Sequence, residues 1–230
     1  MDVAVVGGTG AEGFGIATRL ARAGHRVVIG SRDAERGAEA GAKATEAAGT
    51  TVEGTDNAAA AAAAGADGVV AVTVPFAGQA EIYRSIKDAL AAGAVVLDAT
   101  SPLATAVGGR PWQVLRPWHG SAAEQAQAIL GAGPRVVGAL HTVAAEALQA
   151  LEQDLNSDVL VCGDDPEAKA RVGSLLDGVP GLRWVDCGRL EMARVAEPLT
   201  ALLVSINRAY KIKDSGFRIV GRDGWGSPQA

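Results

Sequence analysis

The 230-residue sequence has few aromatic side chains, few cysteines and no excess of positive charge. Aromatic residues make up 4% of the chain, which leaves few side chains that stack on nucleic-acid bases. The formal net charge is −5 and the isoelectric point lies near 5.3, whereas nucleic-acid-binding proteins usually carry a basic face. We therefore expect no nucleic-acid partner.

Membrane, export and metal-binding signals are also missing. The apolar stretches are as short as strands or are interrupted by charges, so none is long enough to span a membrane. Met1 leads directly into Asp2 without a basic segment, which predicts that there is no signal peptide. The cysteines, Cys162 and Cys187, and the three histidines have neither a disulfide pattern nor a metal-binding spacing. We expect a cytoplasmic protein with no membrane partner and no metal.

The sequence is rich in small residues and in short apolar runs. Hydrophobic residues reach 48% and the mean hydropathy is +0.16, which indicates a folded core rather than disorder. Apolar runs alternate with Ala-, Glu- and Arg-rich segments of helical length, which predicts an α/β fold. Because the runs do not alternate with polar residues, their strands are expected to be parallel and buried on both faces. The predicted strands are 3–6, 26–29, 68–73, 94–97, 135–140, 158–162 and 182–185, with 51–53 as a weaker candidate.

Helix ends follow from capping residues. Thr55 is predicted to cap a helix over 57–64, and Gly65 is predicted to end it. Ser121 and Glu124 have the spacing of a capping box. A last long helix is predicted over 189–211, and a loop over 105–120. The polar, glycine-rich residues 221–230 are expected to fray.

The strongest functional motif follows the first predicted strand. Gly8, Gly10 and Gly13 satisfy the pattern Gly-x-Gly-x-x-Gly between a strand and an amphipathic helix. In this motif the first glycine permits a tight turn, the second lets the backbone approach a pyrophosphate, and the third lets the helix approach the strand. The N–H groups and dipole of the helix N-terminus then hold the anion. A glycine-rich turn without a ligand is the alternative, but the context favours a dinucleotide site in a Rossmann-like, doubly wound, mostly parallel sheet.

The acidic residue that NAD sites usually place at the end of the second strand is missing. Ser31 and Arg32 stand there instead, and Arg36 lies one helical turn further on. A carboxylate would repel a 2′-phosphate, whereas a hydroxyl and two guanidinium groups would bind it. The sequence therefore predicts a preference for NADP(H). Alternatively, the two arginines pair with Asp33 or Glu35 on the helix surface.

Ligands in such sheets lie beyond the carboxyl ends of the strands. Thr73 and Phe76 follow the fourth predicted strand, where Phe76 lies near the expected nicotinamide ribose or, equally well, in the core. His141 follows the sixth and either donates a hydrogen bond to a bound heterocycle or is a structural histidine. No nucleophile motif such as Gly-x-Ser-x-Gly is present. Hydride transfer between two cofactors needs positioning rather than a nucleophile, so we name no catalytic residue.

Several segments together resemble one family. They are the glycine motif, Gly30 to Arg32, Ala139 to Thr142, Val161 to Asp165 and Arg194 to Thr200. Over about residues 2–220 the chain resembles NADPH-dependent reductases of coenzyme F420, an 8-hydroxy-5-deazaflavin. The resemblance implies reversible hydride transfer between C4 of the nicotinamide and C5 of the deazaflavin, in a homodimer. It also implies an NADP-binding domain over 1–188 and a small helical part over 189–230 that completes the deazaflavin pocket.

At matching positions the resemblance implies two sets of contacts. The NADP contacts, which include the glycine motif, are Gly8, Thr9, Gly10, Ala11, Glu12, Gly13, Ser31, Arg32 and Arg36. The nicotinamide half is lined by Thr73, Phe76, Ala106 and Ala145. The deazaflavin contacts are His141, Arg194, Thr200 and Ser215. Arg194 suits the anionic phosphodiester and glutamyl tail of the coenzyme. Its alternative is a pairing with Glu191 or Glu197 on the helix face.

The sequence departs from the family pattern in places. Ala144 stands where proline is expected, and Pro198 stands where serine is expected. Residues 105–120, with Trp112 and Trp118, do not resemble the family stretch well. Two other functions stay open: an NADPH-dependent flavin or ferric reductase on the same scaffold, and an NADP-sensing module without catalysis.

Overall fold

Valine-rich runs form most of the strands, because branched side chains pack well on a pleated sheet that is buried on both faces. The computed structural model describes residues 1–221. Along the chain the elements are β1 (Asp2–Val6), α1 (Ala11–Arg22), β2 (Arg26–Ser31), α2 (Ala34–Ala48), β3 (Val52–Asp56), α3 (Asn57–Ala63), β4 (Val69–Val72), α4 (Phe76–Ile86), η1 (Lys87–Ala89), β5 (Val95–Asp98), η2 (Ala104–Val107), α5 (Ala122–Leu130), β6 (Arg135–Gly138), α6 (Ala145–Gln149), β7 (Ser157–Gly163), α7 (Pro166–Asp177), β8 (Leu182–Asp186), η3 (Leu190–Met192), α8 (Ala193–Ala196) and α9 (Leu199–Tyr210), where η marks a 3₁₀ helix.

The strands form one sheet with the order β3-β2-β1-β4-β5-β6-β7-β8. β1 to β6 are parallel, and the strand order reverses between β1 and β4, where ligands of doubly wound sheets bind. The predicted doubly wound, mostly parallel α/β fold is confirmed. The expectation that all predicted strands are parallel is wrong for β7 and β8, which pair in parallel with each other while β7 runs antiparallel to β6.

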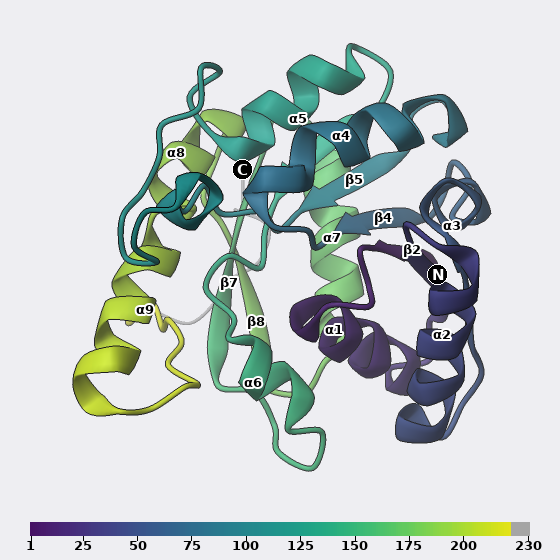
Figure 1. Ribbon diagram of the computed structural model, residues 1–230, viewed down its shortest axis with the longest axis horizontal. Helices are drawn as coiled ribbons and strands as arrows, with labels where there is room; N and C mark the ends of the chain where they lie inside the picture. Colours follow the sequence, from purple (N-terminus) through teal and green to yellow (C-terminus); the bar gives the residue numbers. More distant parts are fainter. Residues whose placement is uncertain (222–230) are drawn as a thin grey trace.

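Helices cover both faces of the sheet (Figure 1). One core holds apolar side chains of α1, α2, α6 and α7, and a second holds those of α3, α4, α5 and α8. Glycines bring helix and strand close together, because a Cβ atom on Gly41 of α2 would meet the backbone N of Gly54 in β3 at 2.8 Å. Part of the abundance of small residues therefore serves close packing on the sheet.

Two predicted helix boundaries need correction. Asp56, not Thr55, caps α3, since its carboxylate accepts from the N–H groups of Ala58 and Ala59 at 3.0 and 2.9 Å. The predicted helix 189–211 is broken into η3, α8 and α9 around Pro198, because a proline has no N–H group for an intrahelical bond. The cap at Ser121 is confirmed, with its hydroxyl accepting from the N–H of Glu124 at 3.0 Å.

The predicted fraying over 221–230 falls on residues 222–230, which lie outside the described part of the chain. Within residues 1–221, no helix is long and apolar enough to cross a membrane.

Candidate active site

The turn from β1 to α1 is open toward the edge of the sheet where β1 and β4 end. Gly7 adopts a φ of +75°, and the N–H of Gly8 donates to the carbonyl oxygens of Val5 and Gly30 at 3.2 and 3.0 Å. A Cβ on Gly8 or Gly13 would overlap neighbouring backbone, whereas a Cβ on Gly10 would meet only the oxygen of Gly7, at 3.6 Å. No side chain caps α1, so its first N–H groups are available to an anion.

Glu12 lies in the first turn of α1 and is half-buried as a residue. Burial, and to a smaller degree the charge of Asp98, raises the pKa of Glu12 to about 8. The group is therefore mostly protonated at pH 7, and it places little negative charge beside the turn.

A cavity of about 380 Å³ lies beside this turn, and we call it the arginine cavity. Its lining includes Thr9, Gly10, Ser31, Arg32, Arg36 and Thr73. None of the ion pairs within residues 1–221 involves either arginine. Asp33 instead caps α2 by accepting from the N–H of Arg36 at 3.0 Å. The structure therefore does not contain the alternative surface ion pairs, and both arginine residues line the cavity.

A second cavity, of about 430 Å³, adjoins the first, and we call it the histidine cavity. The two share Gly10, Thr73, Val74 and Pro75 at the ends of β1 and β4. The segments after β5 and β6 form further walls, and α9 with the residues that follow it forms the remaining wall. The histidine cavity brings together the predicted residues Gly10, Ala11, Glu12, Thr73, His141, Ala145, Thr200 and Ser215.

His141 has a buried imidazole in the wall of this cavity, with a side chain that is 6% exposed overall. Neither Nδ1 nor Nε2 has a hydrogen-bond partner within the described residues. Burial lowers the pKa of His141 to about 4, so the ring is neutral at pH 7. Leu140 before it adopts a φ of +72°, a costly conformation for a branched residue that is often found at functional sites. Buried polar groups normally have partners, so the imidazole is suited to a ligand.

A chain of hydroxyl groups connects the strand-end loops to α9. Thr200 donates from Oγ1 to the carbonyl oxygen of His141 at 2.7 Å, and Oγ1 lies 2.6 Å from Oγ of Ser101. Because the Thr200 proton is engaged by a carbonyl, Ser101 is the donor in the second bond. Both hydroxyls line the histidine cavity, where they offer lone pairs to a ligand.

Asp98 lies at the end of β5, close to the loop that forms this wall, and it is completely buried. Its carboxylate accepts from the hydroxyl of Tyr83, the amide of Gln79 and the N–H of Thr100 at 2.6, 2.7 and 2.7 Å. Burial raises the pKa of Asp98, although these hydrogen bonds oppose the shift. The network fixes the loop that carries Ser101.

Three groups of predicted residues lie elsewhere. Phe76 and Ala106 line a side cavity of about 170 Å³, which shares Pro75, Ser101 and Leu103 with the histidine cavity. Gly8 and Gly13 lie inside the β1–α1 turn and line neither main cavity. Arg194 also lines neither, and it pairs with Glu124, with Nε 2.7 Å from the carboxylate. Its contact with a deazaflavin stays a prediction, and the pairing partner is neither Glu191 nor Glu197.

Sequence reasoning missed several lining residues. Asn57 lines the arginine cavity and accepts from the N–H of Gly7 at 3.2 Å, an interaction over fifty positions that no local pattern signals. Asn207 and Lys213 line the histidine cavity. Lys213 could have been found from the sequence, because it lies two residues before the predicted contact Ser215.

The doubly wound sheet, with a glycine-rich turn at the point where the strand order reverses, defines the class of Rossmann-type NADP-dependent oxidoreductases. The model of the family "NADP oxidoreductase coenzyme F420-dependent" matches residues 2–102. The F420-dependent NADP reductase of Methanothermobacter thermautotrophicus is 40% identical over 223 residues, which cover 95% of this chain and 94% of that protein. The chain belongs to the family of F420-dependent NADP reductases.

Two further proteins support this assignment. The F420-dependent NADP reductase of Methanocaldococcus jannaschii is 38% identical over 224 residues, which cover 95% of this chain and 98% of that protein. A crystal structure from Arthrobacter sp. FB24, described as a candidate F420-dependent NADP reductase, superposes with a TM-score of 0.78 at 27% identity. That superposition covers 95% of this chain and 99% of the Arthrobacter chain.

Proposed function

We propose that this protein transfers a hydride reversibly between NADP(H) and coenzyme F420. The observation that carries the proposal is that the arginine and histidine cavities meet at the β1–β4 switch point, in a chain 40% identical to F420-dependent NADP reductases over 95% of its length. In the balanced reaction NADPH, oxidised F420 and a proton give NADP⁺ and reduced F420.

The arginine cavity suits the adenosine half of NADP(H). The open turn before α1 would receive the pyrophosphate, and Arg32, Arg36 and Ser31 would receive the 2′-phosphate. Thr73 lies in both cavities, where the nicotinamide half would pass from one to the other. Phe76, Ala106 and Ala145 would line that half, as the family resemblance implies.

The histidine cavity suits the deazaflavin. His141 and Ser215 each place in its wall a buried polar group that has no partner among residues 1–221, and a heterocycle with carbonyl and ring nitrogen atoms would satisfy them. Residues 1–188 would bind NADP(H), and the part from 189 onward would complete the deazaflavin pocket through Thr200 and Ser215. The bound cofactors supply the hydride donor and acceptor, while the chain orients them and excludes water.

A spectroscopic assay of the purified protein tests the proposal. Mixing it with NADPH and oxidised F420 is expected to bleach the deazaflavin absorbance, and reduced F420 with NADP⁺ is expected to restore it. Turnover of flavins or ferric complexes without turnover of F420 would favour the alternative reductase. Binding of NADP with no acceptor across a panel would favour a sensing module.

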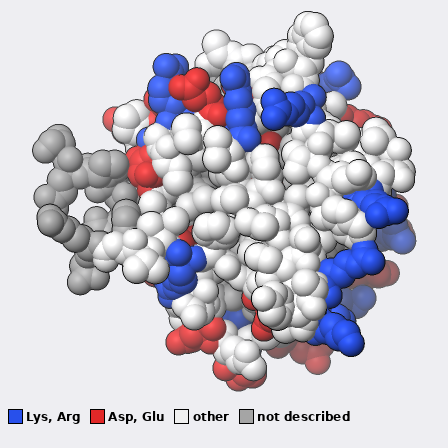
Figure 2. Space-filling model, turned by 90° about the vertical axis from the view of Figure 1, so that its left-hand side faces the viewer, with Lys and Arg blue, Asp and Glu red and all other residues white. Residues whose placement is uncertain are grey.

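We further propose that the protein is a cytoplasmic homodimer, with a candidate interface on the face that carries α8 and α9. The middle of this face is largely free of charged side chains (Figure 2). Val195 and Leu202 are 59% and 48% exposed, and Tyr210 is 75% exposed. Large apolar side chains on one exposed face are typical of interaction sites, and among soluble oligomers the two-fold homodimer is the commonest form.

The variant Leu202→Glu tests this interface. A carboxylate in an apolar contact between two copies is expected to convert the dimer to a monomer in analytical ultracentrifugation. The control is Ala38→Glu on the exposed side of α2, which is expected to leave the mass unchanged. A wild-type protein that sediments as a monomer, or an unchanged Leu202→Glu dimer, would reject this interface.

A further inference from the structure

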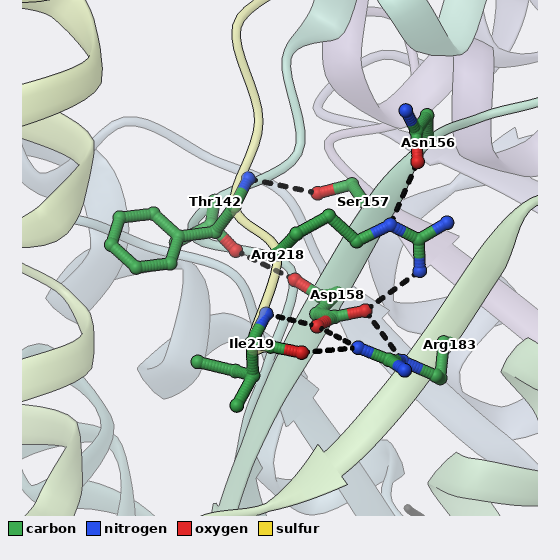
Figure 3. Close-up of polar contacts among 8 residues, drawn as sticks. Thr142, Asn156, Ser157, Asp158, Arg183, Arg218 and Ile219 are labelled. Carbon is green, nitrogen blue, oxygen red and sulfur yellow. Dashed lines mark hydrogen bonds and ion pairs between the residues drawn. The ribbon is translucent and has the colours of Figure 1, made fainter. Parts of the chain in front are cut away.

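The chain that follows α9 returns to the sheet and lies beside β7 (Figure 3). Lys211 ends α9 in the left-handed region with a φ of +54°, which turns the chain back. The N–H of Asp158 then donates to the carbonyl oxygen of Phe217 at 2.6 Å, and the N–H of Phe217 donates to Oγ of Ser157 at 3.4 Å. We call residues 213–219 the returning segment.

Asp158 is the centre of the contacts between the returning segment and the sheet (Figure 3). Its carboxylate is completely buried and accepts from Arg183 at 2.6 and 2.8 Å, and from Nη1 of Arg218 at 2.9 Å. It also accepts from the N–H of Ile219. Burial tends to raise the pKa of Asp158, but the hydrogen bonds from Arg183, Ile219 and Arg218 hold it below its ordinary value. The carboxylate therefore stays charged and joins three segments of the chain.

Asp158 also contacts the segment that carries His141 in the wall of the histidine cavity. The hydroxyl of Thr142 donates to the carbonyl oxygen of Asp158 at 3.1 Å, and Thr142 directly follows His141. On the other side, Ser215 lies three residues before Arg218 and has a buried, unpartnered hydroxyl in the cavity wall. Asp158 thus connects the two segments that carry these unpartnered polar groups.

We propose that Asp158 is a positioning residue for the deazaflavin half of the site: its carboxylate fixes the returning segment through Arg218 and Ile219, while its backbone carbonyl holds Thr142 of the His141 loop. The inference rests on the proposed function. Asp158 lines neither main cavity and acts only through its neighbours. The NADP half of the site is built by β1, β2 and β4. Weakening the contacts of Asp158 with the returning segment is therefore expected to affect binding of F420 and not of NADP(H).

Steady-state kinetics with each substrate varied in turn test the proposal. Arg218→Gln removes one partner and keeps the Arg183 pair, so the protein stays folded, and Asp158→Asn removes the charge itself. Both are expected to raise KM for F420 by about tenfold while KM for NADPH changes less than about twofold. Arg218→Lys keeps the charge and is expected to restore part of the loss.

The matched control is Glu53→Gln, which breaks the exposed ion pair with Arg26 at the β2–β3 edge and is expected to change neither KM. Equal increases in both KM values, or lower thermal stability with an unchanged KM for F420, would leave Asp158 only a structural role and overturn the proposal. Failure of the wild-type protein to turn over F420 at all would instead reject the proposed function, and with it this inference.

Discussion

Replacing Arg32 with alanine is expected to raise KM for NADPH by about 10- to 100-fold and to leave KM for NADH nearly unchanged. A charge-assisted hydrogen bond contributes about 1.5–3 kcal/mol, and each 1.4 kcal/mol is a factor of about ten in affinity. Arg32 lines the arginine cavity without an ion-pair partner in residues 1–221, so its guanidinium is free for a phosphate. The measurement is kcat/KM with each dinucleotide at saturating F420.

The control is Arg171→Ala on α7, which removes a half-buried arginine whose side chain donates to the carbonyl oxygen of Ala66. It is expected to leave both values unchanged. If Arg32→Ala shows no loss with NADPH, or an equal loss with NADH, the 2′-phosphate lies elsewhere.

The fold was predictable as far as it depends on local pattern. Continuous apolar runs located the strands other than β3 within a few residues, and the glycine motif located the β1–α1 turn. The polar strand β3 was only a weaker candidate. The direction of β7 was not predictable, because a run such as Val159 to Val161 is equally apolar in either direction. The contact of Glu197 with α5, where its carboxylate accepts from the N–H groups of Ala122 and Ala123 at 2.8 and 2.9 Å, was not predictable either. A contact over some seventy positions leaves no local signal.

Part of the candidate site was likewise predictable from local sequence pattern, and part was not. Ser31, Arg32 and Arg36 follow from a strand end and one helical turn, and they line one cavity. His141 was a candidate from its place after a predicted strand, whereas Thr200 and Ser215 came only from the family resemblance. The three residues lie on separate segments that the tertiary structure brings together. Arg194 was placed at the deazaflavin by the same resemblance, but its partner is Glu124, seventy residues away. No sequence motif signals the contacts around Asp158.

Replacing His141 with leucine is expected to make the protein more stable and less active. The imidazole is buried with both nitrogens unpartnered, and each such group costs about 1–3 kcal/mol, which leucine of similar size does not incur. The same change removes a hydrogen bond to the deazaflavin, so kcat/KM for F420 is expected to fall by about 10- to 100-fold. Urea unfolding and steady-state kinetics measure the two effects.

The control is His25→Leu, because Nδ1 of His25 is also buried without a partner within residues 1–221. His25 lines neither main cavity and directly precedes β2, whereas Ser31 of the arginine cavity lies at the other end of that strand. It is expected to leave kcat/KM unchanged. A histidine that serves only the structure would show the opposite pattern at position 141, with lower stability and unchanged turnover per folded molecule.

The stability gain of His141→Leu is expected to grow as the pH falls. Burial lowers the pKa of His141 in the folded protein from 6.5 to about 4. Between these values the unfolded chain binds a proton that the folded protein does not, so wild-type stability is full above pH 6.5 and declines toward pH 4. The shift corresponds to about 3 kcal/mol, and leucine lacks this dependence. Unfolding at pH 7, 5.5 and 4.5 measures the difference, and a difference independent of pH would mean that the imidazole is not buried in the neutral form.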